Sequence, residues 1–193
     1  MMFLTDFADQ GVILPVILAV GVVLAAYGWW RSAVMWLAVT GGTFAVVLVL
    51  KFGFIGCGPV FDHFGVRSPS GHTAAGAILA GGLAALFTRR RWIVFAIATL
   101  AAAVIGLSRF ALGMHTAAEA LLGGAIGILG AVVMAHLLRP RATKPPVVAL
   151  AVAVLLAVLL HGRRLPAEPV IARAALATMQ YFPACRVRDD QAR

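Results

Sequence analysis

Few side chains in this sequence carry a charge, and negative charge is the scarcest. Only 12% of the 193 residues are charged, and 7 are Asp or Glu against 16 Lys and Arg. A soluble domain has about 25% charged and roughly 45–50% apolar residues, whereas this chain is 62% hydrophobic. A chain of this length cannot bury so many apolar groups in a core of its own. The composition therefore excludes an ordinary soluble domain and indicates a bilayer protein.

The sequence also shows no internal repeat and no low-complexity tract, and we expect no soluble domain beside the membrane domain. Acidic Asp6 and Asp9 precede the first apolar segment, where a signal peptide carries a basic region, so we expect no cleavable signal. The basic residues are scattered over several short loops rather than gathered in one patch. Nucleic-acid binding is therefore a poor fit, and attraction to anionic lipid headgroups accounts for the net charge of +9.

The hydropathy pattern predicts an all-α, polytopic membrane protein, since about 20 apolar residues cross the hydrocarbon of a bilayer. We expect six transmembrane helices, at residues 11–30, 32–50, 71–88, 92–107, 116–138 and 146–161. Residues 1–162 then form the transmembrane domain, and residues 163–193 form a C-terminal extramembrane tail. One short interfacial helix is expected in this tail, between residues 170 and 181.

Positive charge in the loops predicts the orientation. Arg31, the run Arg89 to Arg91, and the basic stretch 139–144 occupy three loops on one side of the six-helix path. Short basic loops stay in the cytoplasm, although six further arginines of the tail oppose this assignment. We therefore expect a bacterial-type inner membrane protein, with the loop at 51–69 and a turn at 108–115 on the outer, periplasmic face.

Polar residues with catalytic potential stand in that outer turn. His115 and Glu119 are four residues apart, so they share one helix face. The carboxylate can accept the proton of one imidazole nitrogen and leave the other nitrogen free to attack. An interhelical hydrogen bond would explain this pair on its own. Arg109 stands nearby, however, and ionisable groups at membrane depth are functional candidates.

A second polar cluster, Pro69-Ser70-Gly71-His72, opens the third expected helix. A helix start presents unpaired N–H groups and a positive dipole end, which suit a phosphate. Ser70 and Gly71 would bind its oxygens, and His72 would protonate the leaving oxygen. A plain helix cap would explain this quartet alone, and snorkelling would explain Lys51 at the end of the second helix. Together the three clusters are hard to explain structurally.

The combined pattern resembles the integral-membrane members of the type 2 phosphatidic acid phosphatase superfamily, which shares its site with vanadium haloperoxidases and bacterial acid phosphatases. The family has three motifs: Lys-(six)-Arg-Pro, Pro-Ser-Gly-His and Ser-Arg-(five)-His-(three)-Asp. The resemblance covers roughly residues 51–130 of this chain. The matching positions here are Lys51 with Gly58-Pro59, then Pro69 to His72, and then Ser108, Arg109, His115 and Glu119.

The resemblance implies a mechanism without a metal or a cofactor. His115 would attack phosphorus to form a phosphohistidine, which water then hydrolyses. His72 would protonate the leaving alcohol, and Glu119 would orient His115. The residues that the resemblance assigns to the phosphate oxygens are Lys51, Ser70, Gly71 and Arg109.

Two positions depart from the family pattern. Gly58 replaces the arginine of the first motif, which removes a bidentate phosphate contact. Arg67 is a candidate for the missing guanidinium, and the alternative is that Arg67 is an interfacial loop charge. Glu119 replaces an aspartate and is longer by one methylene, but it can still accept the imidazole proton.

The expected substrate is a lipid phosphate whose tail stays in the bilayer. Candidates are undecaprenyl diphosphate, phosphatidylglycerol phosphate, phosphatidate and the lipid A 1-phosphate, with a polyprenyl or glycerolipid phosphate favoured. A lipid phosphotransferase using the same phosphohistidine and a non-catalytic lipid-binding protein are the alternatives. Small residues such as Gly123 and Gly127 are expected to pack helices within one chain, so we expect a monomer.

The sequence has only two cysteines, Cys57 and Cys185, and the six-helix path puts both on the outer face. An oxidising periplasm permits disulfides, so one hypothesis pairs them and pins the tail over the mouth of the active site. The alternative is two unrelated small apolar residues, since pairing requires a geometry that sequence does not give.

Overall fold

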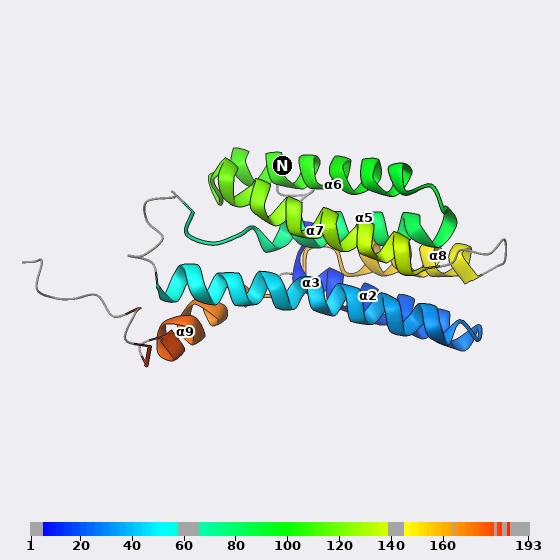
Figure 1. Ribbon diagram of the computed structural model, residues 1–193, viewed down its shortest axis with the longest axis horizontal. Helices are drawn as coiled ribbons and strands as arrows, with labels where there is room; N and C mark the ends of the chain where they lie inside the picture. Colours follow the sequence, from blue (N-terminus) through cyan, green and yellow to red (C-terminus); the bar gives the residue numbers. More distant parts are fainter. Residues whose placement is uncertain are drawn as a thin grey trace, which may run out of the picture.

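The computed structural model describes residues 6–57, 66–138, 145–163, 165–179, 181–182 and 185. Within these residues the regular structure is entirely α-helical (Figure 1). The helices are α2 (Gln10–Ala26), α3 (Trp30–Gly56), α5 (Gly71–Phe87), α6 (Arg91–Ala111), α7 (Ala117–Leu137), α8 (Pro145–Leu159) and α9 (Ala167–Met179).

Helices occupy all six of the segments in which the sequence predicts them, but two helices run further than expected. Helix α3 continues to Gly56, so Lys51 lies within it rather than after it. Helix α6 continues to Ala111, so Ser108 and Arg109 are helical and the predicted turn at 108–115 is wrong in its first half. The chain leaves α6 at Gly113, whose positive φ of 67° suits a residue without a Cβ.

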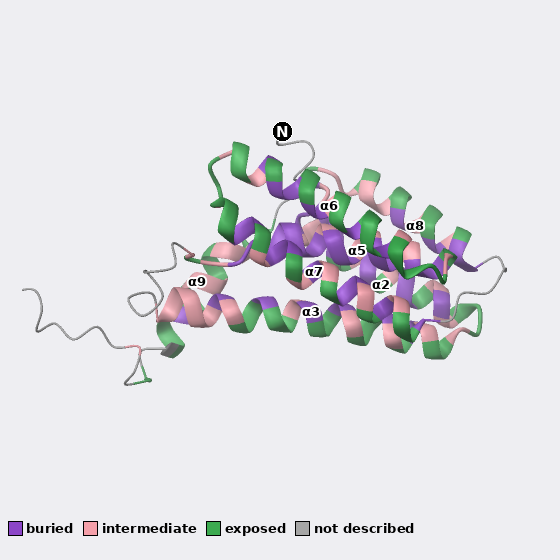
Figure 2. Ribbon diagram, turned by 45° about the horizontal axis from the view of Figure 1, so that its top comes forward, coloured by how far each residue is buried: buried purple, intermediate pink, exposed green. Residues whose placement is uncertain are grey.

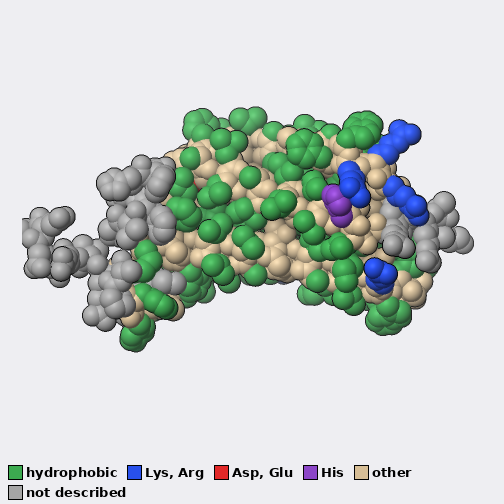
Figure 3. Space-filling model, in the orientation of Figure 1, with side chains coloured by type: hydrophobic (Ala, Val, Ile, Leu, Met, Phe, Trp, Pro, Cys, Tyr) green, Lys and Arg blue, Asp and Glu red, His purple; other side chains and the backbone are tan. Residues whose placement is uncertain are grey.

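Three of these helices, α3, α6 and α7, are long and apolar enough to cross a membrane. Helices α2, α5 and α8 are apolar but shorter, with 15 to 17 residues each. Exposed apolar side chains cover the outside of the bundle, for example Leu121 at 74% and Leu18 at 61% exposure. They spread over the middle of the face in Figure 3, while Lys and Arg side chains gather at one end. Both features fit a helical membrane protein.

Helix α5 lies at the centre of the bundle, against α6 and α7 (Figure 2). Glycines permit this close approach, because a Cβ at Gly123 would overlap the carbonyl oxygen of Ser70, and one at Gly127 would overlap that of Ala74. The pair Gly123 and Gly127 thus packs α7 against α5 within the chain. Because these glycines bring the start of α7 beside the start of α5, they also set the spacing of the candidate site.

Helices α2, α3 and α8 complete the bundle around this centre. Helix α2 packs on α8 and α3, and the buried indole Nε1 of Trp36 donates a hydrogen bond to the carbonyl of Ile17 at 2.9 Å. Helix α9 packs along α3 and lies near its C-terminal end in Figure 1. It begins three residues before the expected interfacial helix and is part of the packed structure.

Candidate active site

The candidate site lies at one end of the bundle, where α3 ends, α5 begins and the chain passes from α6 to α7 (Figure 1). An open pocket of about 1120 Å³ marks this end. Its lining includes Arg67, Arg109, His115, Glu119 and Glu168. The turn between α5 and α6, which carries the arginine run, lies at the other end of the bundle.

His115 and Glu119 form the best-defined contact of the site. Nδ1 of His115 lies 2.9 Å from Oε2 of Glu119, and the two side chains are 8% and 7% exposed. A carboxylate at Nδ1 holds the proton there, which leaves Nε2 as the nitrogen with a free lone pair. Burial lowers the pKa of His115, and the nearby Arg109 and Lys51 lower it further, while Glu119 raises it. The imidazole is therefore kept neutral to lower pH than a free histidine.

Glu119 also holds the backbone around His115 in place. It is the third residue of α7, and it forms a capping box with Thr116, whose hydroxyl accepts from the Glu119 N–H while Oε2 accepts from the Thr116 N–H at 3.0 Å. Its Oε1 accepts from the backbone N–H groups of Arg67 and Ser68, at 2.8 and 3.1 Å. The Glu119 side chain thus joins the segment before α5 to the start of α7. The pattern Thr116-x-x-Glu119 was the signal for this cap in the sequence.

Lys51 and Gly71 meet on the other side of the site. The Lys51 side chain is 2% exposed, so its ammonium does not snorkel into solvent. A Cβ at Gly71 would lie 3.6 Å from Cε and 3.9 Å from Nζ of Lys51, which places the ammonium beside the first residue of α5. The cation therefore lies next to the N-terminal end of α5, which carries the positive end of the helix dipole.

His72 and Arg109 hold the two buried polar atoms that have no hydrogen-bond partner among the described residues, namely Nδ1 of His72 and Nε of Arg109. Arg109 interacts electrostatically with both His72 and His115, so the three side chains belong to one cluster. Buried polar groups are normally paired, and an oxyanion would satisfy these donors. The orphaned atoms are therefore consistent with a phosphate site.

Ser70 and Arg67 make structural contacts, and their predicted phosphate-binding roles stay predictions. Ser70 is fully buried and caps α5, because its Oγ accepts from the N–H and the hydroxyl of Thr73, at 3.4 and 2.9 Å. Its own hydroxyl proton remains available to an anion. The Arg67 side chain is exposed and lines the pocket, and its backbone N–H supports Glu119. Gly58 lies outside the described residues.

The site also contains two carboxylates, from Asp9 and Glu168, that the sequence did not indicate as site residues. Asp9 caps α2 and lies 3.5 Å from His72, measured between Oδ2 and Nε2. Glu168 of α9 places both carboxylate oxygens within 2.6 Å of Nζ of Lys51. An acid directly before an apolar run is a helix N-cap signal, which could have located Asp9 at the start of α2. No local pattern signals Glu168, because it comes from the opposite end of the sequence.

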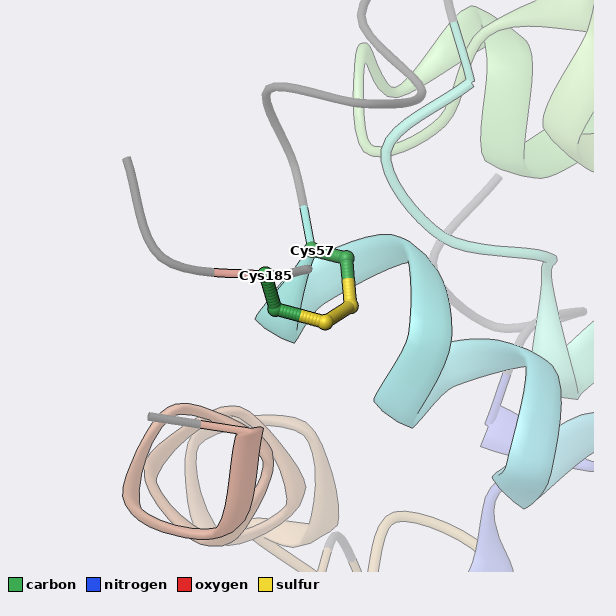
Figure 4. Close-up of a disulfide and its surroundings, with 2 residues drawn as sticks. All are labelled: Cys57 and Cys185. Atoms are coloured by element: carbon green, nitrogen blue, oxygen red, sulfur yellow. A yellow bond between two sulfur atoms is a disulfide. The ribbon is translucent and has the colours of Figure 1, made fainter. Parts of the chain in front are cut away.

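A disulfide joins Cys57 at the end of α3 to Cys185 beyond α9 (Figure 4), with a Cα–Cα distance of 4.4 Å. The bond ties the C-terminal part of the chain to the helix that carries Lys51. No group of three or more His, Cys, Asp or Glu side chains that could hold a metal ion occurs in the part of the chain that the structure describes.

His115 and Arg109 line one open pocket. Lys51 is paired with Glu168 of the pocket lining, and His72 interacts electrostatically with Arg109. A cluster of imidazoles and cations of this kind suits a phosphate group. The family model of the PAP2 superfamily matches residues 36–143, which is more than half of the chain, so the protein belongs to the PAP2 superfamily. This confirms the resemblance drawn from the three motifs, and it indicates a phosphatase that acts on phosphate esters. No curated protein and no solved structure matches the chain significantly.

Proposed function

We propose that the protein is an integral-membrane lipid phosphatase that hydrolyses a phosphomonoester or diphosphate lipid through a phosphohistidine at His115. The contact between His115 and Glu119 is the observation that carries this proposal. It presents a neutral, oriented imidazole to a pocket that Arg109 also lines. These are the requirements of a nitrogen nucleophile for a phosphate.

The reaction proceeds in two displacements. Nε2 of His115 attacks phosphorus, the bond from phosphorus to the ester oxygen breaks, and His72 gives its proton to the departing alcohol. Water then attacks the phosphohistidine, His72 takes the proton of that water, and inorganic phosphate leaves as His115 is regenerated. Lys51, Arg109 and the N–H of Gly71 stabilise the charge on the phosphate oxygens in both steps.

An apolar groove supports a lipid as the substrate. The groove has a volume of about 570 Å³ and lies between α6 and α7, with small residues such as Gly106 and Gly124 along it. Phe110 lines both this groove and the polar pocket. A hydrocarbon tail in the groove would therefore place its phosphate in the pocket. Undecaprenyl diphosphate and glycerolipid phosphates have the required combination of tail and headgroup.

The proposed setting is a bacterial-type inner membrane, with residues 1–162 as a domain of six transmembrane helices and the pocket on the periplasmic face. The separation of the pocket from the arginine run along the bundle supports this orientation. Residues 163–193 form the proposed extramembrane tail, of which α9 adds Glu168 to the pocket. The proposed partners are the substrate and the surrounding membrane lipids, and the proposed unit is a monomer.

Phosphate release from a panel of lipid phosphates, measured on detergent-solubilised protein, tests the proposal. We expect release of inorganic phosphate from at least one of the named lipids and loss of that release in His115→Ala. Release or transfer that requires an added acceptor lipid would identify a phosphotransferase instead. Binding of the lipids without any phosphoryl transfer would identify a non-catalytic member of the superfamily.

A further inference from the structure

Each catalytic histidine has its own carboxylate, and the second carboxylate comes from outside the family match. Asp9 precedes α2, whereas the match to the family model begins at residue 36. Oδ2 of Asp9 lies 3.5 Å from Nε2 of His72, and both side chains are only 8% exposed. The other ring nitrogen of His72 is buried and has no partner among the described residues.

The backbone fixes the orientation of the Asp9 carboxylate. Its Oδ1 accepts hydrogen bonds from the N–H groups of Gly11 and Leu165, at 2.8 and 3.0 Å. With Oδ1 engaged in this way, Oδ2 is the oxygen that faces His72. The carboxylate is therefore held in place by the start of α2 and by the segment before α9.

We propose that Asp9 is a positioning residue for the general acid, one that holds a proton on Nε2 of His72 and so assigns Nδ1 to the leaving oxygen. This inference rests on the proposed function. As the phosphoryl group transfers to His115, the proton on Nδ1 of His72 moves to the departing alkoxide. His72 becomes neutral, and its remaining proton, on Nε2, faces Asp9. The free lone pair on Nδ1 then accepts the proton of the attacking water.

Comparing substrates with different leaving groups distinguishes this role of Asp9 from a structural one. An alkyl alkoxide needs a proton to depart, whereas nitrophenolate departs without one. Asp9→Asn should therefore slow the formation of phosphoenzyme from octyl phosphate by about 10²-fold or more, the scale of lost general acid catalysis. The nitrophenolate burst from p-nitrophenyl phosphate should keep its wild-type rate, and phosphoenzyme should accumulate because the second step also needs His72.

The variants are chosen so that α2 still forms. Asparagine and serine are good helix N-caps, and the asparagine oxygen can still accept from Gly11 and Leu165. Asp9→Ser is the second variant and should show the same dependence on the leaving group. Equal slowing of both esters in both variants would overturn the role of Asp9. A wild-type protein that forms no phosphoenzyme from either ester would overturn the proposed function and this inference with it.

The contact between α3 and α9 independently carries a second inference. Both oxygens of Glu168 lie within 2.6 Å of the Lys51 ammonium, which a bound phosphate would also need. Glu168 lines the same pocket as Arg109 and His115, and it interacts electrostatically with Arg109 and His72. Its carboxylate presents two anionic oxygens to these groups, as a phosphate would. Its side chain is 37% exposed, so it can turn toward solvent without a large desolvation change.

We infer that Glu168 occupies the anion position of the resting site and must be displaced by the substrate phosphate. This inference also rests on the proposed function. Helix α9 is held on both sides, by the bond from Leu165 to Asp9 and by the disulfide from Cys185 to Cys57. These tethers keep Glu168 at a high effective concentration beside Lys51, so it returns when phosphate leaves.

Binding of inorganic phosphate, measured by calorimetry in the His115→Ala background, tests this competition without turnover. Adding Glu168→Gln should tighten the dissociation constant by about tenfold or more, because a charge-assisted contact at Lys51 no longer has to be broken. Glu168→Asp has a shorter reach and should give an intermediate value. Thr178→Ala, on an exposed part of α9, should leave the constant unchanged.

An unchanged or weaker dissociation constant in Glu168→Gln would mean that Glu168 supports the site rather than competes for it. Should that variant fail to fold, the shorter acid in Glu168→Asp decides the matter, because tighter binding supports competition and weaker binding contradicts it. Absence of phosphate binding in the His115→Ala protein and in every double variant would overturn the anion site itself, and the proposed function with it.

Discussion

The two histidines of the candidate site are held in different ways. His115 lies 2.9 Å from Glu119, whose oxygens also accept from three backbone N–H groups, so His115 is held by a connected network of hydrogen bonds. His72 lies 3.5 Å from Asp9, and its Nδ1 has no partner within the described residues. The difference suits the proposed division of labour. A nucleophile must be fixed in one tautomer, whereas a proton carrier needs a free nitrogen.

Replacing each histidine in turn should have the largest effect on catalysis and tests whether the two histidines have different roles. His115→Ala should abolish phosphoenzyme formation from every ester, because the proposed mechanism places the phosphoryl group on Nε2 of His115. His72→Asn should abolish turnover of alkyl phosphates but still form phosphoenzyme from p-nitrophenyl phosphate. Radiolabel transfer from the phosphate of each ester to the protein measures both. A labelled His115→Ala protein would refute the assignment of the nucleophile.

Glu119→Gln should sharpen the comparison by removing the negative charge of the orienting group and one of its two acceptor oxygens. Glutamine has one acceptor oxygen, so it can complete the capping box with the Thr116 N–H or accept from the Arg67 N–H, but not both. A circular dichroism spectrum and a melting temperature equal to those of the wild type are therefore the control for folding. The turnover number should fall by about 10²–10⁴-fold, the scale of a lost catalytic tautomer. The family residue in Glu119→Asp should retain more activity than Glu119→Gln. Equal activity of the wild type and Glu119→Gln would show that the carboxylate only caps the helix.

The sequence was sufficient to predict the contact between His115 and Glu119 but not the partners of Lys51 and His72. His115 and Glu119 are four residues apart, so helical periodicity alone brings them together. Glu168 reaches Lys51 only because α9 packs along α3, and Asp9 reaches His72 only because α2 lies beside α5. Such contacts depend on how helices pack, and a single sequence contains no local signal for them.

The end of α6 shows a second limit of prediction from sequence. The polar residues Ser108 and Arg109 suggested a turn, yet the helix continues for two more residues and leaves its path at Gly113. The buried Ser108 hydroxyl donates to the carbonyl of Ile105 at 2.8 Å, so it is satisfied within the helix. Polar residues therefore did not indicate where the helix ends, whereas the glycine did.

Arg67→Ala tests the Arg67 side chain separately from the Arg67 backbone, which donates a hydrogen bond to Glu119. The variant keeps the N–H that donates to Oε1, so it removes only the guanidinium that lines the pocket. If Arg67 replaces the arginine absent at Gly58, kcat/KM should fall by about tenfold to over a hundredfold, since a charge-assisted contact contributes roughly 1.5–3 kcal/mol. Gly58→Arg should then partly restore it. Unchanged kinetics would make Arg67 a loop charge.

Filling the apolar groove should affect only substrates with a tail. Ala103 is exposed and lines the groove, whereas Ala96 on the same helix is exposed outside it. Ala103→Phe should raise KM for a long-chain lipid phosphate by about tenfold, the equivalent of roughly two CH2 groups no longer buried. KM for p-nitrophenyl phosphate should stay constant, and so should both values in Ala96→Phe. An equal rise in KM for both substrates would show that the lipid tail does not bind in this groove.

The smallest expected effect is a shift in the pH at which His115 becomes protonated, which tests the environment of the imidazole without a substrate. Burial lowers the pKa of His115, so the imidazole should remain neutral and reactive below the ordinary value of about 6.5 and protonate only as the pH falls further. The rate of carbethoxylation by diethyl pyrocarbonate, mapped to His115 by mass spectrometry, follows its neutral fraction. Glu119→Gln should move this transition to still lower pH, because Glu119 is the partner that raises the pKa. A midpoint at or above that of a free histidine peptide would contradict the buried, neutral nucleophile on which the difference between the two histidines depends.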